Sequence, residues 1–248
     1  MRLQIKDVGM RFGKLHALQG VHASVDGGKV VALLGPNASG KTTLLRTIAG
    51  LIQASKGSIE LDGVKVNRMS PHDRASKISW VPRVAEVAGS FSIRRVVELG
   101  RYALGPSPMR VDDALAQVDL LDRSETLWHG ASAGMRQRVA LARALAQRTP
   151  GGLLVLDEPS SALDLSHLKA LGDLLRLCAS EGDVVIAALH DISFAMEIAD
   201  EVIVLKEGKV VLAGETSAVL TPSSLGGVYG LDLTWAVDDA GKRHLVMP

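Results

Sequence analysis

The chain has 248 residues, 47% of them hydrophobic, and a formal net charge of +1 at pH 7. A chain of this length can bury one large core or an α/β core with a subdomain, while its near-neutral charge and few aromatic rings argue against a nucleic-acid partner. The single cysteine, Cys178, excludes an internal disulfide framework, and the lack of a signal-peptide pattern or of a membrane-length apolar run predicts a cytoplasmic protein that reaches a membrane only through a partner.

Short strands separated by Gly and Asp turn signals are predicted for the first part of the chain. Their apolar residues recur in short runs or at alternate positions, as is typical of strands. We therefore expect this part to be rich in β-structure, with strands at Leu3–Val8, Val21–Val25, Lys29–Leu34, Ile59–Leu61 and Ile78–Val81.

A phosphate-binding loop is predicted between the third of these strands and a helical pattern at Lys41–Ala49. Residues 35–42 match the pattern GxxxxGK[ST], in which backbone N–H groups and the start of the following helix attract phosphate. In this pattern Lys41 would reach the β and γ phosphates of a nucleotide, and the Thr42 hydroxyl would hold Mg²⁺. The alternative is an ordinary surface turn. The residues of the loop are Gly35, Pro36, Asn37, Ala38, Ser39, Gly40, Lys41 and Thr42.

Helical periodicity replaces the strand pattern in the middle of the chain. It is clearest at Ser92–Gly100, Asp112–Asp119 and Ala133–Gln147. Strands and helices then alternate, which implies a parallel sheet covered on both faces. The expected elements are a strand at Leu153–Asp157, a helix at Leu165–Ala179, a strand at Val184–Leu189, a helix at Ile192–Ala199 and a strand at Glu201–Lys206.

Two adjacent carboxylates, Asp157 and Glu158, close the strand Leu153–Asp157. Acids often stand at the solvated edge of a sheet, so this pattern alone is weak. Beside a phosphate loop, however, Asp157 can join the Mg²⁺ shell, and Glu158 can orient an attacking water as a general base.

Three later segments complete an ordered set of motifs: ASAGMRQRVALARA at Ala131–Ala144, SALD at Ser161–Asp164, and His190-Asp191 after a strand. With them the chain resembles the ATP-binding subunit of ABC transporters over nearly its whole length. The resemblance implies an ATP hydrolase that uses Mg²⁺, with an α/β fold of the P-loop NTPase type. It also implies a RecA-like parallel-sheet core, an N-terminal antiparallel β part and an inserted helical subdomain. The expected division of the single domain 1–248 is 1–84 plus 151–220 as the ATP-binding core, 85–150 as the helical insert and 221–248 as a C-terminal extension.

The resemblance further implies an ATP site shared by two subunits, either two copies or two paralogues, that close head to tail. Each ATP would lie on the Gly35–Thr43 loop and on Asp157 of one subunit. The other subunit would cover it with Ser132, Ala133 and Gly134.

Three single residues also match the family's pattern. Phe12 would stack on the adenine, although a lone aromatic at a strand end is also typical of a core. His190 would contact the γ-phosphate, where outside this series a lone histidine would more often be structural. Asp164 would reach across the dimer, and it can also cap the helix that follows it.

Within the family, three segments resemble importers of iron-siderophores, haem and cobalamin: Phe91–Tyr102, Ala162–His167 and Val219–Gly230. Importers of molybdate and tungstate share much of the same pattern. A soluble ABC-type ATPase of assembly or regulation, as in iron-sulfur cluster assembly, and a separately encoded exporter ATPase remain alternatives.

The importer interpretation brings further partners and a location. We expect an integral membrane permease, an indirect periplasmic or surface binding protein, and a peripheral position on the cytoplasmic face of the inner membrane. An apolar strip within Val81–Val97, with the basic Arg83, Arg94 and Arg95 beside it, is expected to receive a cytoplasmic helix of the permease. The alternative is a solvated basic edge.

Departures from the family pattern affect the expected rate of ATP turnover. Arg83 stands where the family has Gln, and a guanidinium cannot ligate a metal. Ala131, Ala133 and Met135 replace Leu, Gly and Gln of the signature, and Ala38 replaces a Gly of the phosphate loop. These changes either impair the ATPase and make it slow, which we favour, or adapt it, with Arg83 pairing with an ATP phosphate or with an acidic loop of a partner.

Overall fold

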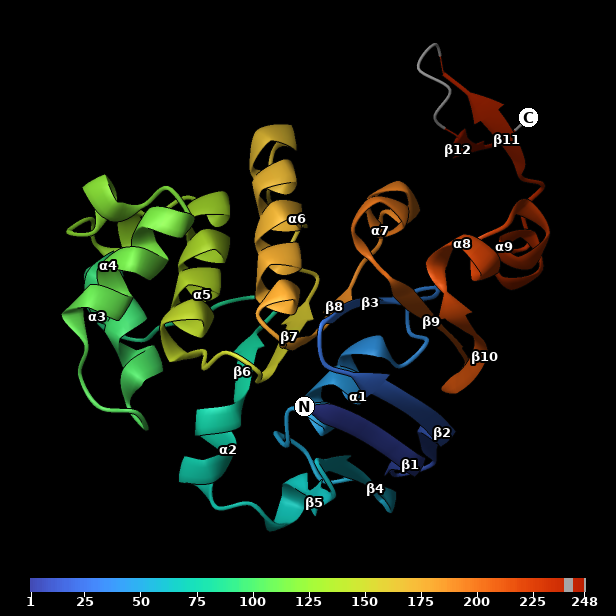
Figure 1. Cartoon of the computed structure of the whole chain (residues 1–248), viewed down its shortest axis with the longest axis horizontal. Coiled ribbons are helices and arrows are strands. Elements are labelled where there is room, and N and C mark those ends of the chain that lie inside the picture. The colour runs from blue at the N-terminus through green and yellow to red at the C-terminus, as the bar shows by residue number, and fades with distance from the viewer. Residues whose placement is uncertain (239–242, 248) are drawn as a thin grey trace.

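The computed structural model describes residues 1–238 and 243–247. Figure 1 shows the N-terminal strands, a central sheet and a group of helices beside it. The described strands form a four-stranded sheet in the order β2-β1-β4-β5, a six-stranded sheet in the order β10-β9-β3-β8-β7-β6 and a small β11-β12 pair.

The four-stranded sheet is the antiparallel part that the resemblance implied. In its register, Leu3 lies opposite Val25 on one side and Leu61 on the other, and all three are buried. Alternating apolar residues of β1 therefore face one core, with a register shift between Ile5 and Val8. The strands are β1 (Arg2–Phe12), β2 (Leu15–Asp26), β4 (Lys56–Leu61) and β5 (Val64–Lys65).

The six-stranded sheet is parallel except at one edge, where β10 runs antiparallel to β9. The strand expected at residues 78–81 is confirmed as β6, the other edge strand of this sheet, which pairs with β7. Parallel strands buried on both faces read as continuous apolar runs. The strands are β3 (Lys29–Leu34), β6 (Ile78–Val81), β7 (Leu153–Asp157), β8 (Val184–Ala188), β9 (Glu201–Lys206) and β10 (Lys209–Glu215).

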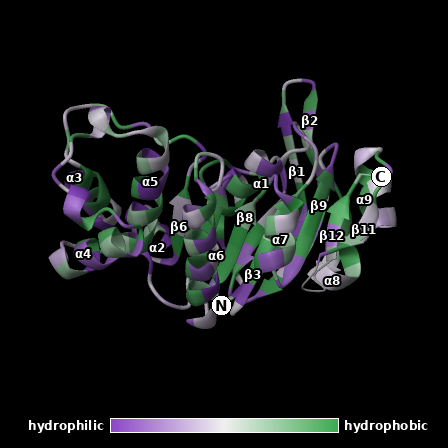
Figure 2. Cartoon of the chain, turned by 90° about the horizontal axis from the view of Figure 1, so that it is seen from above, coloured by the Kyte–Doolittle hydropathy of each residue, from purple (hydrophilic) through white to green (hydrophobic). Residues whose placement is uncertain are grey.

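Two apolar cores lie on the two faces of the six-stranded sheet, whose central strands are hydrophobic in Figure 2. Along β3, Val31 and Leu33 face the core shared with the N-terminal sheet and with α1 (Lys41–Ile48). Val30 and Ala32 face the core shared with α6 (Leu165–Ser180) and α7 (Ile192–Ile198). The sheet is covered on both faces, as expected, although one cover includes a second sheet.

The helical insert packs beside the edge strand β6 and away from the N-terminal sheet (Figure 1). We expected its second helix at residues 112–119, but the helix begins four residues earlier because Pro108 starts its first turn. It ends at Gln117, and Asp119 adopts a left-handed backbone with φ 54°. The helices are α3 (Ile93–Glu98), α4 (Pro108–Gln117) and α5 (Ala133–Gln147), and α2 (Pro71–Lys77) precedes β6.

The C-terminal part follows the edge strand β10 and lies beside it in Figure 1. No helix in the part of the chain that the structure describes is long and apolar enough to cross a membrane. The remaining elements are α8 (Thr216–Val219), α9 (Pro222–Tyr229), β11 (Thr234–Val237), β12 (Arg243–Val246) and single 3₁₀ turns at Val66–Arg68, Leu99–Arg101, Leu121–Arg123 and Trp128–Gly130.

Candidate functional site

The predicted phosphate loop joins β3 to α1 and needs glycine at its two ends. Gly35 has φ 139° and Gly40 has φ 105°, both in the region that side chains disfavour. A Cβ on Gly35 would stand 2.0 Å from the Leu205 carbonyl oxygen, and one on Gly40 would stand 2.6 Å from that of Ala17. The loop is therefore closed tightly between β9 and β2.

Lys41 begins α1 and folds back over this loop. Its Nζ donates to the carbonyl oxygens of Gly35 at 2.7 Å and of Pro36 at 3.2 Å. Burial lowers the pKa of the Lys41 ammonium, and the nearby Glu158 and Asp157 carboxylates oppose that shift. A nearly buried cation held only by carbonyl oxygens is well placed for an incoming phosphate.

Thr42 and Asp157 offer two oxygen ligands suited to Mg²⁺. The Thr42 hydroxyl donates to Asp157 Oδ1 at 3.0 Å, and Asp157 is only 1% exposed. Burial raises the pKa of this carboxyl, and the Thr42 hydrogen bond opposes the rise. Mg²⁺ takes oxygen ligands and keeps several waters, so nucleotide oxygens and water would complete its shell.

Glu158 lies at the centre of a second group of polar side chains, just past the end of β7. It is 5% exposed and has a left-handed backbone with φ 52°. Its Oε1 is 2.6 Å from His190 Nε2, and its Oε2 is 2.8 Å from Arg83 Nε. The ends of the adjacent strands β8, β7 and β6 thus bring His190, Glu158 and Arg83 together.

A cavity of 670 Å³ is lined by Arg83 and Glu158 together with residues of the phosphate loop, and His190 and Asp157 are not part of its lining. Phe12 is 52% exposed and lines the cavity, so the alternative of a core phenylalanine is wrong. The Ser39 hydroxyl is buried and has no hydrogen-bond partner among the described residues, which leaves a donor for a bound phosphate. Other predicted residues on the wall are Asn37, Ala38, Gly40, Lys41, Thr42, Thr43, Arg83 and Glu158.

Several lining residues carried no sequence signal. The cavity also contacts Leu15, His16 and Gln19 of the β1–β2 hairpin and Glu207 of the β9–β10 turn. Hairpin pairing and the strand order of the core sheet bring them there. No motif marks them.

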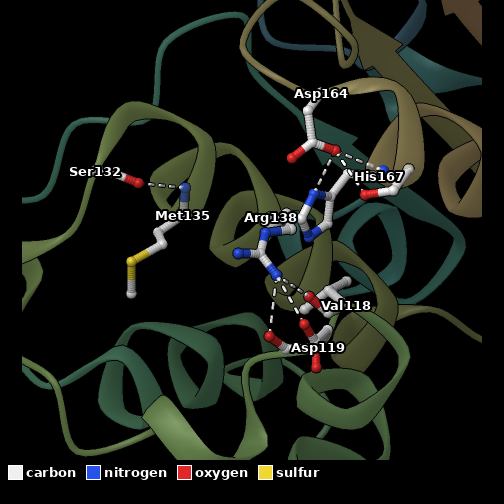
Figure 3. A network of polar contacts seen from close by, with 8 residues as sticks. Val118, Asp119, Ser132, Met135, Arg138, Asp164 and His167 are labelled. Atoms are coloured by element: carbon white, nitrogen blue, oxygen red, sulfur yellow. Dashed lines mark hydrogen bonds and ion pairs between the residues drawn. The ribbon is translucent and has the colours of Figure 1, made fainter.

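The signature residues lie elsewhere, at the N-terminus of α5. The Ser132 hydroxyl accepts a hydrogen bond from the Met135 N–H at 3.2 Å and so caps this helix (Figure 3). Ala133 is the first helical residue and is not among the described residues with positive φ, so its methyl group strains no backbone. A Cβ on Gly134 would stand 2.9 Å from the Ala162 carbonyl oxygen, so this glycine permits close packing within the chain.

Asp164 caps α6 close to this region (Figure 3). Its Oδ1 accepts from the His167 N–H at 2.9 Å and from the Ser166 hydroxyl at 2.8 Å, and these bonds hold the pKa of Asp164 well below its usual range. Neither Asp164 nor residues 132–134 line the cavity. The structure therefore separates the predicted site residues into two groups on one chain.

Arg83 and the predicted permease strip differ from expectation in detail. Arg83 was expected either to impair turnover or to pair with an ATP phosphate or an acidic partner loop, whereas in the structure its guanidinium pairs with the Glu158 carboxylate of the same chain. Val81 and Val97 are buried core residues, so residues 81–97 do not form one exposed apolar strip. Arg94 is tied within the insert, because it pairs with Asp112 at 2.6 Å.

Comparisons with known proteins agree with this arrangement. Residues 18–161 match the model of the ABC transporter family. The chain is 34% identical over 255 residues to the "Cobalamin import ATP-binding protein BtuD" of Halobacterium salinarum. The match covers 100% of this chain and 64% of that relative, so the chain spans less than two thirds of the relative's length. It is 40% identical over 218 residues to the "Hemin import ATP-binding protein HmuV" of Nocardia farcinica, covering 86% of the chain and 75% of that protein. A solved dimer of the ATP-binding cassette MJ0796 with ADP and Pi superposes with a TM-score of 0.79 at 27% identity over 86% of this chain and 98% of the other.

Proposed function

Because the chain belongs to the ABC transporter family, we propose that it is the ATP-binding and ATP-hydrolysing subunit of an importer. The observation that carries this proposal is the single cavity wall shared by the phosphate loop, Lys41, Thr42 and Glu158. The product of the reaction would be ADP and phosphate, and the free energy released would drive motion of a membrane partner.

Five side chains in or beside the cavity would act on ATP, water or Mg²⁺: Lys41, Ser39, Glu158, Thr42 and Asp157, with His190 as the partner of Glu158. Lys41 would leave its carbonyl partners for the β and γ phosphates, and the Ser39 hydroxyl would gain a partner there. Glu158 would hold the attacking water and take its proton at Oε1 or Oε2, while His190 orients the carboxylate. Thr42 and Asp157 would hold Mg²⁺, which supplies charge neutralisation on the phosphates when bound.

A second subunit is part of the proposal, because Ser132 and Asp164 lie outside the cavity of their own chain. Both stand at helix N-termini, where N–H groups and the helix dipole favour a phosphate. The solved cassette to which the chain is similar is a dimer. We therefore infer that a second copy or a paralogous subunit covers each ATP with residues 132–134.

The proposed permease contact is a hollow of 280 Å³ on the helical insert. Tyr102 lines it and is 94% exposed, and Leu99 beside it is also exposed. Arg95 lines the same hollow, and its guanidinium forms an ion pair with the Glu98 carboxylate at 2.8 Å. An apolar floor with charged residues around it suits the end of a partner helix. This contact would place the chain on the cytoplasmic face of the inner membrane as a peripheral subunit.

The proposed cargo is a metal chelate or a corrinoid, such as a siderophore, haem or cobalamin. Support comes from the relatives, whose names specify cobalamin and hemin import, and from the three segments that resemble such importers. A periplasmic or surface binding protein would deliver the cargo to the permease.

Substitution of Lys41 tests the nucleotide site directly. Lys41→Ala removes a charge-assisted contact to phosphate and should lower Mg-ATP affinity by more than about tenfold in calorimetry. Lys56→Ala is the control, because it removes a surface lysine whose partner is Asp7 at 2.8 Å, away from the cavity. Equal ATP affinity in the Lys41 variant and the parent would contradict the proposed site.

A further inference from the structure

Arg83 and Glu158 meet because they leave neighbouring strands at the same level. In the β6–β7 register Val81 lies beside Leu156, and Arg83 and Glu158 each follow two residues later, past the ends of the two strands. Parallel pairing thus brings the Arg83 guanidinium to the carboxylate, with Nε and Oε2 2.8 Å apart. The Arg83–Glu158 ion pair therefore follows from the parallel register of β6 and β7.

This ion pair restrains the proposed general base. His190 holds Oε1 of Glu158 and Arg83 holds Oε2, so both oxygens of the carboxylate are engaged. A water placed for attack must compete with one of these partners. Arg83 is the more readily displaced partner, since its side chain is 60% exposed and follows the last residue of an edge strand.

Arg83 also stands within reach of the phosphate position. It lines the same cavity as Lys41 and Thr42. It has no second ion pair among the described residues. A guanidinium matches phosphate with a planar fork of donors, and a phosphate carries more charge than a carboxylate.

We propose that Arg83 exchanges partners when ATP binds, moving from Glu158 to the terminal phosphate. The ion pair holds Glu158 in the empty site, and the terminal phosphate releases it for catalysis. ADP lacks this phosphate, so Arg83 stays on Glu158 and the site distinguishes the triphosphate from the diphosphate. This inference rests on the proposed function, because it takes ATP as the ligand of the cavity.

The ratio of ATP to ADP affinity tests the inference. Arg83→Gln should weaken ATP binding by about tenfold, the lower end for a hydrogen bond to a charged group, and should leave ADP binding unchanged within about twofold. Arg83→Lys keeps the charge without the fork and should recover part of the ratio. Calorimetric titrations with excess EDTA measure binding without hydrolysis, and Lys56→Gln, which breaks the exposed Lys56–Asp7 pair, is the matched control.

A second measurement tests the exchange itself. In nucleotide-free protein, the melting-temperature shifts of Arg83→Gln and Glu158→Gln should not add in the double variant, because the two side chains interact. In ATP-saturated protein with EDTA, the same two shifts should add, because Arg83 has left the carboxylate.

The possible outcomes distinguish failure of the Arg83 exchange from failure of the proposed ATP site. If the parent binds ATP but Arg83→Gln changes ATP and ADP affinity equally, or changes neither, the exchange is refuted while the ATP site stands. Non-additive shifts that persist in saturating ATP would also refute it. A parent chain that binds neither nucleotide would refute the proposed function, and this inference with it.

Discussion

Ala38 occupies a strained position in the phosphate loop, and replacing it with glycine should stabilise the protein. Its φ is 61°, in the left-handed region, which costs an L-residue about 1–2 kcal/mol. Glycine removes that strain but adds about 0.4–1 kcal/mol of conformational freedom to the unfolded chain. Because the Ala38 side chain is exposed, little packing is lost. We expect Ala38→Gly to raise the free energy of unfolding by about 0.5–1 kcal/mol.

Thermal unfolding of nucleotide-free protein measures this effect. For a chain of this size the expected gain corresponds to a rise in Tm of about 1–4 °C. Gly35→Ala is the opposite change in the same loop: its Cβ would stand 2.0 Å from the Leu205 carbonyl oxygen, and we expect a loss of more than about 2 kcal/mol. A lower Tm for Ala38→Gly, or an unchanged Tm for Gly35→Ala, would refute the reasoning from backbone strain.

Two further predictions concern the surface and the core. Tyr102→Asp should weaken co-purification with the permease, because it places a charge in the exposed hollow of the insert. The same variant should leave ATP binding by the isolated chain unchanged. Co-purification at the parent level would argue against this surface. Burial raises the pKa of the Cys178 thiol to about 11, so iodoacetamide at pH 8 should label the unfolded chain and not the native one. Labelling of native protein at the rate of a free thiol would show that Cys178 is accessible.

Elements with continuous apolar patterns were predictable to the residue. The sequence prediction matches β3, β7, β9 and α5 at both ends, because each is buried against a core on one or both faces. Elements without such a pattern were missed. No residue of α2 is buried, and α9 carries two glycines, so neither shows the apolar periodicity of a helix.

The N-terminal hairpin shows a different limit of sequence reasoning. Its strands were expected at residues 3–8 and 21–25, whereas β1 and β2 run to Phe12 and from Leu15. Residues 11–16 are all exposed, so no buried face repeats at every second position there. Backbone pairing alone extends the hairpin and carries Phe12 to the cavity.

The candidate site divides in the same way. The phosphate-loop pattern marks Lys41 and Thr42, and the end of the apolar strand β7 marks Asp157. The fold brings the Thr42 hydroxyl to 3.0 Å from Asp157 Oδ1, while the roles of these residues toward ATP and Mg²⁺ stay predictions. The contact of Arg83 with Glu158 depends on the register of β6 against β7, which no local pattern specifies. The division of the chain at residues 84, 150 and 220 stays a prediction, as do the catalytic roles of Glu158 and His190.

The most direct test of the account is ATP turnover by Glu158→Gln. This variant removes the base and keeps the size of the side chain, so it should bind ATP and hydrolyse it far more slowly than the parent, and a closed dimer should accumulate in size-exclusion chromatography. Glu215→Gln, at an exposed position that ends β10, is the control and should keep the parent rate. Hydrolysis by Glu158→Gln at the parent rate, with no ATP-dependent dimer, would contradict the claim that this cavity is an ATPase site with Glu158 as its base.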